Sequence, residues 1–353
     1  MSLLFSPLTI KEVTFRNRIT ISPMCTYSAT DGFANDWHLV HYGSRAVGGA
    51  GFIIQEATAV SPEGRISLGD LGLYSDDHIA MLQRINAFIH QHGSVAGVQL
   101  AHAGRKASCA LSWDGGKQLS HEEGGWNTVA PSAVPFNSQD RVPQELDAEG
   151  IKKVVGDFKM AALRALQANY KVIEIHAAHG YLIHQFLSPL SNFRSDEYGG
   201  SFENRIRLLL EIIEAVKTVW PQSLPLMVRI SATDWVESGW DVDEAVLLAS
   251  ALKTYGVDLV DTSSGGMVPY ATISPAPGYQ IPFAARIKAE SGILTGSVGL
   301  IIEAQQAEEI LQNQYADLIL FGRESLRDPN LAFNAAKSLN EDVEWPIQYV
   351  RAK

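Results

Sequence analysis

The chain alternates between two patterns of hydrophobic and polar positions. Short runs rich in Val, Ile and Leu are typical of buried strands, and longer stretches with apolar residues at helical spacing are typical of amphipathic helices. Strands are predicted at residues 19–22, 52–56, 95–100, 172–176, 226–230, 259–263, 293–296 and 318–321. Helices are predicted at residues 37–47, 77–92, 147–167, 202–219, 242–254, 282–290, 303–312 and 329–338.

This alternation predicts the fold class. Strands that alternate with helices favour a parallel sheet or barrel, and eight such units are the pattern of a (β/α)8 TIM barrel. The sequence carries no low-complexity linker or charge block that marks a domain boundary. We therefore predict an α/β protein with a single TIM-barrel domain over residues 1–353.

Two predicted connections are too long for plain strand-to-helix loops. They follow the third and fourth strands, at residues 101–145 and 177–201. Active sites of TIM barrels are built at the C-terminal ends of the strands, so loops there are expected to form lids or pocket walls. The alternative is that they are surface decoration.

The fourth predicted strand leads into the most informative motif. Because side chains alternate along a strand, Glu174 and His176 are expected to face the barrel interior, opposite to Ile173 and Ile175. The strand ends in the sequence His176-Ala177-Ala178-His179-Gly180-Tyr181. Two imidazoles and a phenol at one strand end can hold an oxygen that gains negative charge and deliver a proton beside it.

Other interpretations of this motif stay open. A polar residue at a strand end is often only structural, and a pair of histidines can also bind zinc. Zinc needs a third ligand, and the sequence has no HExxH helix to supply one. An iron–sulfur cluster is excluded on ligand count, because the only cysteines are Cys25 and Cys109 and no Cys-x-x-Cys occurs.

Three further strand ends carry polar groups. Cys25 and Tyr27 follow the first strand, and Cys25 fits either a cofactor contact or a small buried apolar side chain. Gln99 is expected to point inward and to need hydrogen-bond partners there. Arg229 is also expected inside the barrel, where its charge needs a partner. The candidates are Glu174 and an anionic cofactor.

The last two strands end in glycine-containing turns. These are Thr295-Gly296-Ser297-Val298-Gly299 and Phe321-Gly322-Arg323. Glycine lets backbone N–H groups approach an anion closely, and TIM barrels often bind phosphate after strands seven and eight. The position of these turns predicts a cofactor that carries a phosphate.

Composition narrows the remaining possibilities. The chain has 353 residues, of which 46% are hydrophobic and 19% charged, and its net charge is -11. An acidic protein of this kind is not expected to bind nucleic acid or anionic membranes. No run approaches the ~18 apolar residues of a membrane span, and the first residues do not resemble a signal peptide. With two cysteines, a reduced, cytoplasmic protein is expected.

Several segments together resemble the Old Yellow Enzyme family of flavin-dependent ene-reductases, over nearly the whole chain. The resemblance is closest to the bacterial, thermophilic-like branch that carries a cysteine near the flavin, of the NADPH dehydrogenase or xenobiotic reductase type. The matching segments are Arg16-Asn17-Arg18-Ile19, Ser22-Pro23-Met24-Cys25, Gln99-Leu100-Ala101-His102-Ala103-Gly104-Arg105-Lys106, His176-Ala177-Ala178-His179-Gly180-Tyr181, Asp196-Glu197-Tyr198-Gly199-Gly200-Ser201, Gly322-Arg323 and Gln348-Tyr349-Val350-Arg351.

The resemblance implies a noncovalently bound FMN at the barrel mouth, with NADPH as hydride donor and NADH as an alternative donor. It implies an ene-reductase that works in two half-reactions on activated alkenes with carbonyl or nitro groups. In this family pattern, His176 and His179 bind the substrate oxygen and Tyr181 donates the proton to the α-carbon. Tyr27 reaches the substrate oxygen or its surroundings.

The resemblance also assigns cofactor contacts. Gln99 and Arg229 are expected along the pyrimidine edge of the flavin. The other expected contacts are Ser22, Pro23, Met24, Cys25 and Ala57 around the ring, and Gly299, Gly322 and Arg323 at the phosphate. Cys25 stands where the yeast-like branch has threonine, and its expected role is to tune the flavin potential.

Two expectations concern other parts of the chain. Arg351, in the tail 340–353, resembles the arginine that this branch inserts into a neighbouring active site, which implies a homodimer or homotetramer. Residues 110–125 are longer than in short members of the branch, so they bear on substrate access. A metal-dependent hydrolase and a flavin-binding protein without turnover are the competing functions. A dienoyl-CoA-reductase-like relative does not fit two cysteines and 353 residues.

Overall fold

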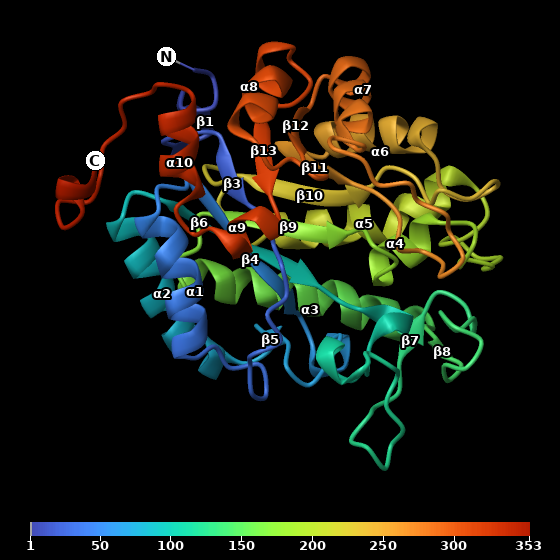
Figure 1. Ribbon diagram of the computed structural model, residues 1–353. Helices are drawn as coiled ribbons and strands as arrows, with labels where there is room; N and C mark the ends of the chain where they lie inside the picture. Colours follow the sequence, from blue (N-terminus) through green and yellow to red (C-terminus); the bar gives the residue numbers. More distant parts are fainter. Residues whose placement is uncertain (1) are drawn as a thin grey trace.

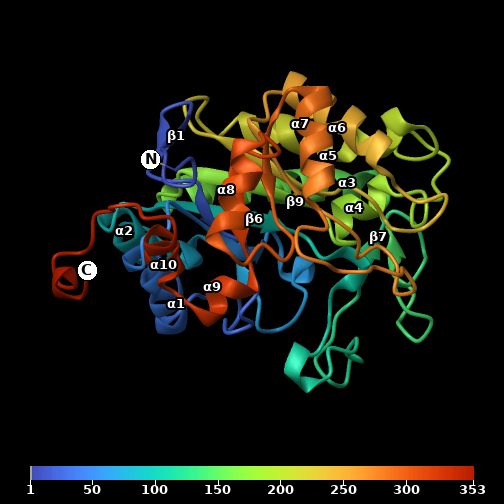
Figure 2. The same cartoon turned by 45° about the horizontal axis from the view of Figure 1, so that its top comes forward.

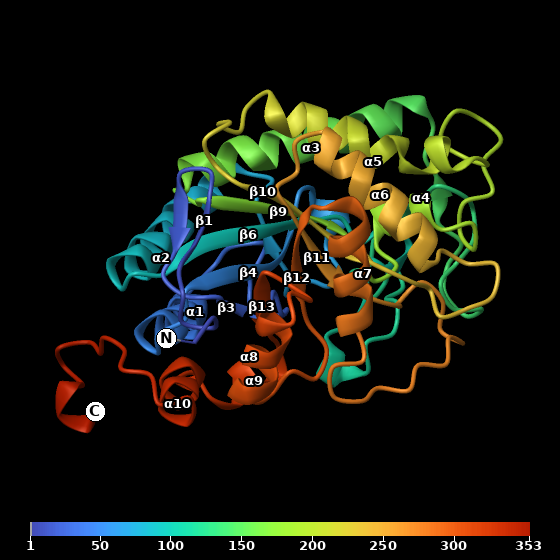
Figure 3. The ribbon, with the colours of Figure 1, turned by 90° about the horizontal axis from the view of Figure 1, so that it is seen from above.

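The computed structural model describes residues 2–353. Eight parallel strands form a closed barrel in the order β3-β13-β12-β11-β10-β9-β6-β4, and β4 pairs back to β3 (Figures 1 and 3). Their bounds are β3 Ile19–Ile21, β4 Phe52–Ala59, β6 Val95–Ala101, β9 Val172–Ala177, β10 Leu226–Ser231, β11 Leu259–Ser263, β12 Leu294–Ser297 and β13 Leu318–Phe321. The predicted TIM barrel is confirmed, with every predicted strand present.

Helices surround the barrel on its outside (Figure 3). They are α1 Asp36–Val47, α2 Ile79–Gln91, α3 Ala148–Gln167, α4 Leu182–Leu187, α5 Phe202–Lys217, α6 Val242–Thr254, α7 Ile281–Ser291, α8 Ala304–Gln312, α9 Arg323–Arg327 and α10 Leu331–Ser338. The eight predicted helices are present with small shifts at their ends. The short helices α4 and α9 were not predicted, because a helix of five or six residues gives almost no periodic pattern.

An antiparallel pair, β1 Leu8–Ile10 and β2 Val13–Phe15, packs against the inner core of the barrel. Phe15 of this pair contacts Phe52 of β4, with ring centroids 4.8 Å apart. The inner core includes Val172, Met227 and Leu259, which are the first or second residues of three neighbouring barrel strands, β9, β10 and β11. The apolar pair therefore fills one end of the barrel, and the polar residues further along the strands lie towards the other end.

The predicted alternation along β9 and β10 is confirmed. Ile173 and Ile175 belong to the core layer between strands and helices, whereas Met227 belongs to the inner core. Glu174 pairs in register with Met227 on one side and with Gln99 on the other. Glu174, Gln99 and their neighbours on the same face therefore lie inside the barrel.

The long connection after β6 contains the short elements η3 Gly104–Lys106, η4 Ser112–Asp114, β7 Val129–Ala130 and β8 Gln144–Glu145. Its segment 110–125, teal in Figures 1 and 2, projects away from the barrel. The connection after β9 contains α4. A short strand, β5 Leu71–Gly72, adds to the edge of β4.

The C-terminal tail extends outwards beyond α10, from residue 340 to η5 Val350–Ala352 (Figure 1). Trp345 stacks on Phe333 of α10 with ring centroids 4.3 Å apart. Arg351 is exposed in η5, and the C-terminal end of this tail lies away from the barrel strands of its own chain in Figure 1. Among the helices of residues 2–353, none is both long and apolar enough to span a membrane.

Candidate active site

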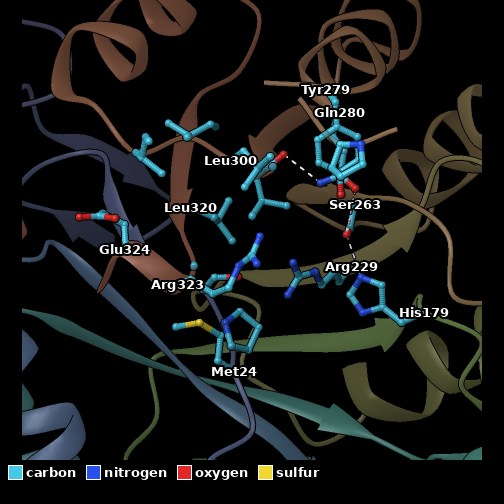
Figure 4. Close-up of a pocket in the computed structure, with 18 of the residues that line it drawn as sticks. Met24, His179, Arg229, Ser263, Tyr279, Gln280, Leu300, Leu320, Arg323 and Glu324 are labelled. Carbon is cyan, nitrogen blue, oxygen red and sulfur yellow. Dashed lines mark hydrogen bonds between the residues drawn. The ribbon is translucent and has the colours of Figure 1, made fainter. Parts of the chain in front are cut away.

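A cavity of about 410 Å³ opens at the C-terminal ends of the barrel strands (Figure 4). This volume lies within the range of about 300–1,000 Å³ that is common for small-molecule and cofactor sites. Its lining includes many of the residues singled out from the sequence: Ser22, Pro23, Met24, His179, Arg229, Gly299, Gly322 and Arg323. We call this space the main cavity.

Two guanidinium groups face the main cavity. Arg229 comes from β10 and Arg323 from the start of α9, and both side chains point into the same space in Figure 4. Nε of Arg229 lies 3.0 Å from Oδ2 of Asp261 on the adjacent strand β11, without the alignment of a hydrogen bond. The sequence offered Glu174 as the protein partner of Arg229, and this is corrected: Asp261 of β11 is in register with Arg229, whereas the β9 residue in register with Arg229 is His176, two positions beyond Glu174.

Glu174 is instead paired with Gln99. Nε2 of Gln99 donates to Oε1 of Glu174 at 2.7 Å, and both side chains are buried. Burial, together with the nearby Asp261 carboxyl, raises the pKa of Glu174 to about 8. Glu174 is therefore predominantly protonated at neutral pH, and the barrel interior carries one main ion pair, between Arg229 and Asp261.

The three residues of the strand-end motif meet at one point. The ring of His176 lies 5.1 Å from the ring of His179 and 5.1 Å from the ring of Tyr181, edge to face in both cases. Nε2 of His179 is hydrogen-bonded to Oγ of Ser263 at 2.8 Å. Burial and the positive charge of Arg229 lower the pKa of both histidines well below the ordinary value, so both imidazoles are neutral.

Tyr181 connects this cluster to a second cavity of about 250 Å³. Tyr27, Lys106 and Cys109 also line the second cavity, on the side of the long β6 connection. Burial raises the pKa of Tyr181 well above the ordinary value, so its phenol keeps its proton. Nζ of Lys106 lies 5.2 Å from the centre of the Tyr181 ring.

The loop that follows β3 is anchored by a residue that the sequence did not indicate. Glu56 of β4 accepts hydrogen bonds from the backbone N–H of Thr26 at 2.7 Å and from its hydroxyl at 2.8 Å. The hydroxyl of Tyr42 donates to the same carboxyl at 2.9 Å. The sequence did not predict this role, because Glu56 is only the last residue of a predicted strand. Its partner Thr26 lies 30 residues earlier in the chain.

Cys25 sits on this anchored loop and is half-buried. Burial raises the pKa of its thiol well above the ordinary value, and the carboxyls of Asp70 and Glu56 raise it further. The thiol form is therefore favoured. Cys25 is not paired with Cys109, since both cysteines are free.

Both glycine turns border the main cavity where the phosphate was predicted, but a β-carbon would have free space only at Gly322. A side chain built on Gly322 would point towards Met24, whose sulfur lies 3.9 Å from that position. Gly299 has a φ of +127°, and a β-carbon there would come within 2.9 Å of Nε2 of Gln280. Gln280 itself lines the main cavity and is held by a hydrogen bond to the carbonyl of Val298 at 3.0 Å. Gln280 was not predicted, because the sequence argument considered residues at strand ends and Gln280 lies directly before α7.

Not every predicted residue lies in the main cavity. Three predicted residues of the described chain line neither cavity: Cys25, Gln99 and His176. Ala57 borders a narrow space beside Tyr181. Residues 2–353 contain no group of three or more His, Cys, Asp or Glu placed to hold a metal ion, so the metal alternative has no ligand set there.

Comparison with known proteins agrees with this geometry. The chain matches the NADH:flavin oxidoreductase / NADH oxidase family over residues 3–342. An NADPH dehydrogenase from Bacillus subtilis (strain 168) is 51% identical over 350 residues, which cover 99% of this chain and 98% of that protein. An NADPH dehydrogenase from Listeria innocua is 51% identical over 356 residues, which cover 100% of this chain and 99% of that protein.

Solved structures are similar as well. Morphinone reductase in complex with tetrahydroNAD is 27% identical with a TM-score of 0.79, over 97% of this chain and 92% of that chain. The old yellow enzyme homologue from Zymomonas mobilis is 27% identical with a TM-score of 0.79, over 98% of this chain and 95% of that chain. The chain belongs to the NADH:flavin oxidoreductase / NADH oxidase family, and it is an oxidoreductase of the Old Yellow Enzyme type.

Proposed function

We propose that the chain is an FMN-dependent ene-reductase that takes reducing equivalents from NADPH, or from NADH, and reduces the C=C bond of α,β-unsaturated carbonyl or nitro compounds. The observation that carries this proposal is the meeting of His176, His179 and Tyr181 beside the main cavity. Two neutral imidazoles and a protonated phenol at one point suit a reaction in which an oxygen gains charge and a carbon gains a proton.

The residues of the main cavity fit FMN. Nε of Arg229, which lines the main cavity, is buried without a hydrogen-bond partner in the described chain, which suits a polar heterocycle with an acceptor at its edge. Arg323 and the space beside Gly322 suit a phosphate, and Gly299 borders the same cavity. The chemistry that FMN supplies when bound is two-electron hydride transfer between a nicotinamide and the alkene.

The loop that Glu56 anchors supplies most of the other proposed cofactor contacts. Ser22, Pro23 and Met24 line the main cavity from this loop, and Ala57 and Cys25 lie beside them on β4 and the same loop. Fixing Thr26 by two hydrogen bonds keeps the loop in one position, which orients its neighbours towards the isoalloxazine ring.

His176 and His179 bind the substrate oxygen in this proposal. A neutral imidazole has one N–H. With this proton on Nδ1, Nε2 of His179 accepts from the hydroxyl of Ser263, which fixes the ring and leaves the Nδ1–H free to donate to the substrate oxygen. Donors that are oriented in advance stabilise the negative charge that builds on the oxygen, and removing one such donor typically costs ~3–4 kcal/mol of barrier. Tyr27 approaches the same region from the second cavity.

Tyr181 donates the proton to the α-carbon. Its raised pKa keeps it protonated over the whole neutral range, and its contact with the His176 ring places the phenol beside the proposed oxygen site. The second cavity, which Tyr181 and Tyr27 share, is the proposed entry for the rest of the alkene. Residues 110–125 border this cavity, and we propose that they influence the size of accepted substrates.

The proposed active unit is a homodimer or homotetramer. Arg351 is exposed in the tail 340–353 and lines neither the main nor the second cavity of its own chain, which suits a contact with a neighbouring subunit. The proposed substrates are small activated alkenes, without nucleic acid or membrane partners. Two free cysteines suit a cytoplasmic enzyme.

The experiment is anaerobic turnover of 2-cyclohexenone by the FMN-loaded protein with NADPH, followed by gas chromatography of the product. Cyclohexanone, with one deuterium incorporated when the solvent is D₂O, is the expected product. Oxidation of NADPH only in amounts stoichiometric with the FMN, without loss of the alkene, would leave an NADPH dehydrogenase that is not an ene-reductase.

A further inference from the structure

The turn that carries His179 and Tyr181 is held by side chains from several elements. The backbone N–H of His179 donates to Oγ of Ser231 at 3.0 Å. Nζ of Lys106 donates to the carbonyl of His179 at 2.8 Å. Both polar groups of this backbone unit are thus paired with side chains, which fixes the backbone that carries the His179 ring.

The next residue, Gly180, is held in the same way. Its carbonyl accepts from Nε2 of Gln185 at 2.7 Å, and its N–H donates to Nδ1 of His184 at 2.9 Å. Gln185 and His184 are both on α4, directly after the turn, and both are fully buried. Because Nδ1 accepts the Gly180 N–H, it carries no proton, and the neutral ring has its proton on Nε2.

Asp234 lies on the other side of the His184 ring. Oδ1 of Asp234 is 3.1 Å from Nε2 of His184, a close polar contact without the full alignment of a hydrogen bond, and both side chains are inaccessible to solvent. The second carboxyl oxygen, Oδ2, accepts from the hydroxyl of Ser188 at 2.6 Å and from the N–H of Trp240 at 2.9 Å. Burial alone would raise the pKa of Asp234, but His184 and these donors lower it below the ordinary value, so Asp234 is a carboxylate.

We propose that Asp234 and His184 are positioning residues: Asp234 fixes the ring tautomer in which His184 accepts the Gly180 N–H, and this hydrogen bond sets the positions of His179 and Tyr181. In metal sites and catalytic triads, a carboxylate likewise fixes the tautomer and the orientation of a histidine. Here the group that the histidine contacts on its other side is the backbone N–H of Gly180. This inference rests on the proposed function of His179 and Tyr181, and neither His184 nor Asp234 lines the main or the second cavity within the described chain.

The surroundings of Gly180 explain why a small change at His184 would reach the site. Gly180 has a φ of +74°, and a β-carbon there would lie 2.1 Å from the carbonyl oxygen of Gly266. Gly266 in turn has a φ of +89°, and its own β-carbon would meet the backbone of His179 at 2.7 Å. The two backbones are in contact, so the turn cannot shift without moving both residues that flank Gly180.

The substitution Asp234→Asn tests the tautomer directly. Oδ2 of Asp234 accepts from two donors, so the amide oxygen of the asparagine must take this place. Its NH₂ group then faces Nε2 of His184 and forces the ring proton onto Nδ1. Two N–H groups would face each other at Gly180, and the turn would be pushed away from its position.

The test compares Asp234→Asn, His184→Asn and the double variant, all FMN-loaded. The amide that His184→Asn introduces can turn its oxygen towards Gly180 whatever stands at position 234, so the double variant is expected to be more active than Asp234→Asn alone. The matched control is His38→Asn, because buried His38 also accepts a backbone N–H through Nδ1, from Asn35 at 3.1 Å, near the start of α1.

Two kinetic readouts separate positioning from general damage. In Asp234→Asn, reoxidation by 2-cyclohexenone is expected to slow at least tenfold, while reduction by NADPH stays within twofold. The affinity for p-hydroxybenzaldehyde, a phenol that mimics an enolate oxygen, is expected to fall at least fivefold. Equal slowing of both half-reactions, or a double variant no better than Asp234→Asn, would overturn the proposal.

A spectroscopic readout keeps the inference testable if Asp234→Asn does not fold. The ¹⁵N shifts of the His184 ring in the wild-type protein are expected to show an unprotonated Nδ1 and a protonated Nε2. A protonated Nδ1 would overturn the proposal without reference to activity. If this tautomer is found and the wild-type protein does not reduce the enone, the proposed function fails and the structural role of the pair stands.

Discussion

Nε of Arg229 lies 3.0 Å from Oδ2 of Asp261, inside the barrel and at the edge of the main cavity. Asp261 lies on β11, next to the strand of Arg229, and its carboxylate balances the positive charge of the guanidinium. Without Asp261, a bound anionic group would be the partner of that charge. We predict that Asp261→Asn lowers the free energy of unfolding of the FMN-free protein by about 3 kcal/mol or more, because it leaves a buried guanidinium unpaired.

The matched control for this prediction is Asp258→Asn. Asp258 pairs with Lys11 at 2.8 Å in a partly exposed ion pair, so its loss is expected to cost about 1 kcal/mol or less. Urea denaturation of both variants measures the difference, and FMN is expected to restore more stability to Asp261→Asn than to the control. Equal losses in the two variants would contradict the role assigned to Asp261.

Glu56 makes stability depend on pH. Its burial raises the pKa of the carboxyl to about 7, above the ordinary value of 4.5. The folded protein therefore holds this proton more tightly than the unfolded chain, and the contribution of Glu56 to stability falls as pH rises from 4.5 to about 7. The fall amounts to as much as roughly 3 kcal/mol.

Glu56→Gln cannot titrate, so the decline in stability between pH 4.5 and pH 7 is expected to be smaller in this variant than in the wild type. Urea denaturation at several pH values measures the two slopes. The control is Glu149→Gln, which changes an exposed carboxyl on α3 and should keep the wild-type slope. A Glu56→Gln slope equal to that of the wild type would show that Glu56 does not retain its proton in the folded state.

Tyr181→Phe separates the proton donor from the rest of the site. We expect reoxidation by 2-cyclohexenone to slow by about 10²–10⁴-fold, as is common when a general acid is removed. Reduction by NADPH should change little, because it needs no proton from the phenol. Stopped-flow traces give both rates, with Tyr198→Phe as the control, whose hydroxyl contacts Glu211 outside the site. If Tyr181→Phe slowed reduction by NADPH and reoxidation by 2-cyclohexenone equally, Tyr181 would not be the proton donor.

The hydrogen bond between His179 and Ser263 predicts a graded effect on ligand binding. His176→Ala removes a donor to the substrate oxygen, so the affinity for p-hydroxybenzaldehyde should fall at least tenfold. Ser263→Ala only frees the His179 ring, and a fall of about threefold is expected on the scale of one neutral hydrogen bond. Spectral titration measures both, and Ser250→Ala on α6 is the control. Unchanged affinity in His176→Ala would remove His176 from the oxygen site.

Arg351 tests whether the active unit is an assembly. If its side chain enters a neighbouring site, Arg351→Ala should raise KM for the enone and leave the rate of reduction by NADPH unchanged. Lys353→Ala, in the same exposed tail, is the control. Analytical ultracentrifugation accompanies the kinetics, because a monomer with full activity is incompatible with the proposed role of Arg351.

The sequence predicted the barrel because its evidence is local. Each strand is a short apolar run, and the alternation that places Glu174 inside and Ile175 outside depends only on neighbours along the chain. The same argument identified His176, His179 and Tyr181, since all three belong to one strand end. The structure brings their rings together as that proximity indicated.

The partners across the barrel could not be predicted in this way. Arg229 pairs with Asp261 rather than Glu174 because strand register decides which side chain is opposite, and register is not visible in one strand. Glu56 acts on a loop 30 residues earlier, and Asp234 acts on a histidine 50 residues earlier. These contacts depend on barrel closure and on long loops, for which a single sequence holds no periodic signal.

An anaerobic visible spectrum tests the central claim most directly. The purified protein is recorded as isolated, after one equivalent of NADPH and then after 2-cyclohexenone. The account predicts a yellow protein that bleaches with NADPH and regains its colour with the enone. A protein that stays colourless after incubation with FMN, or one that bleaches but is not reoxidised by the enone, would contradict it.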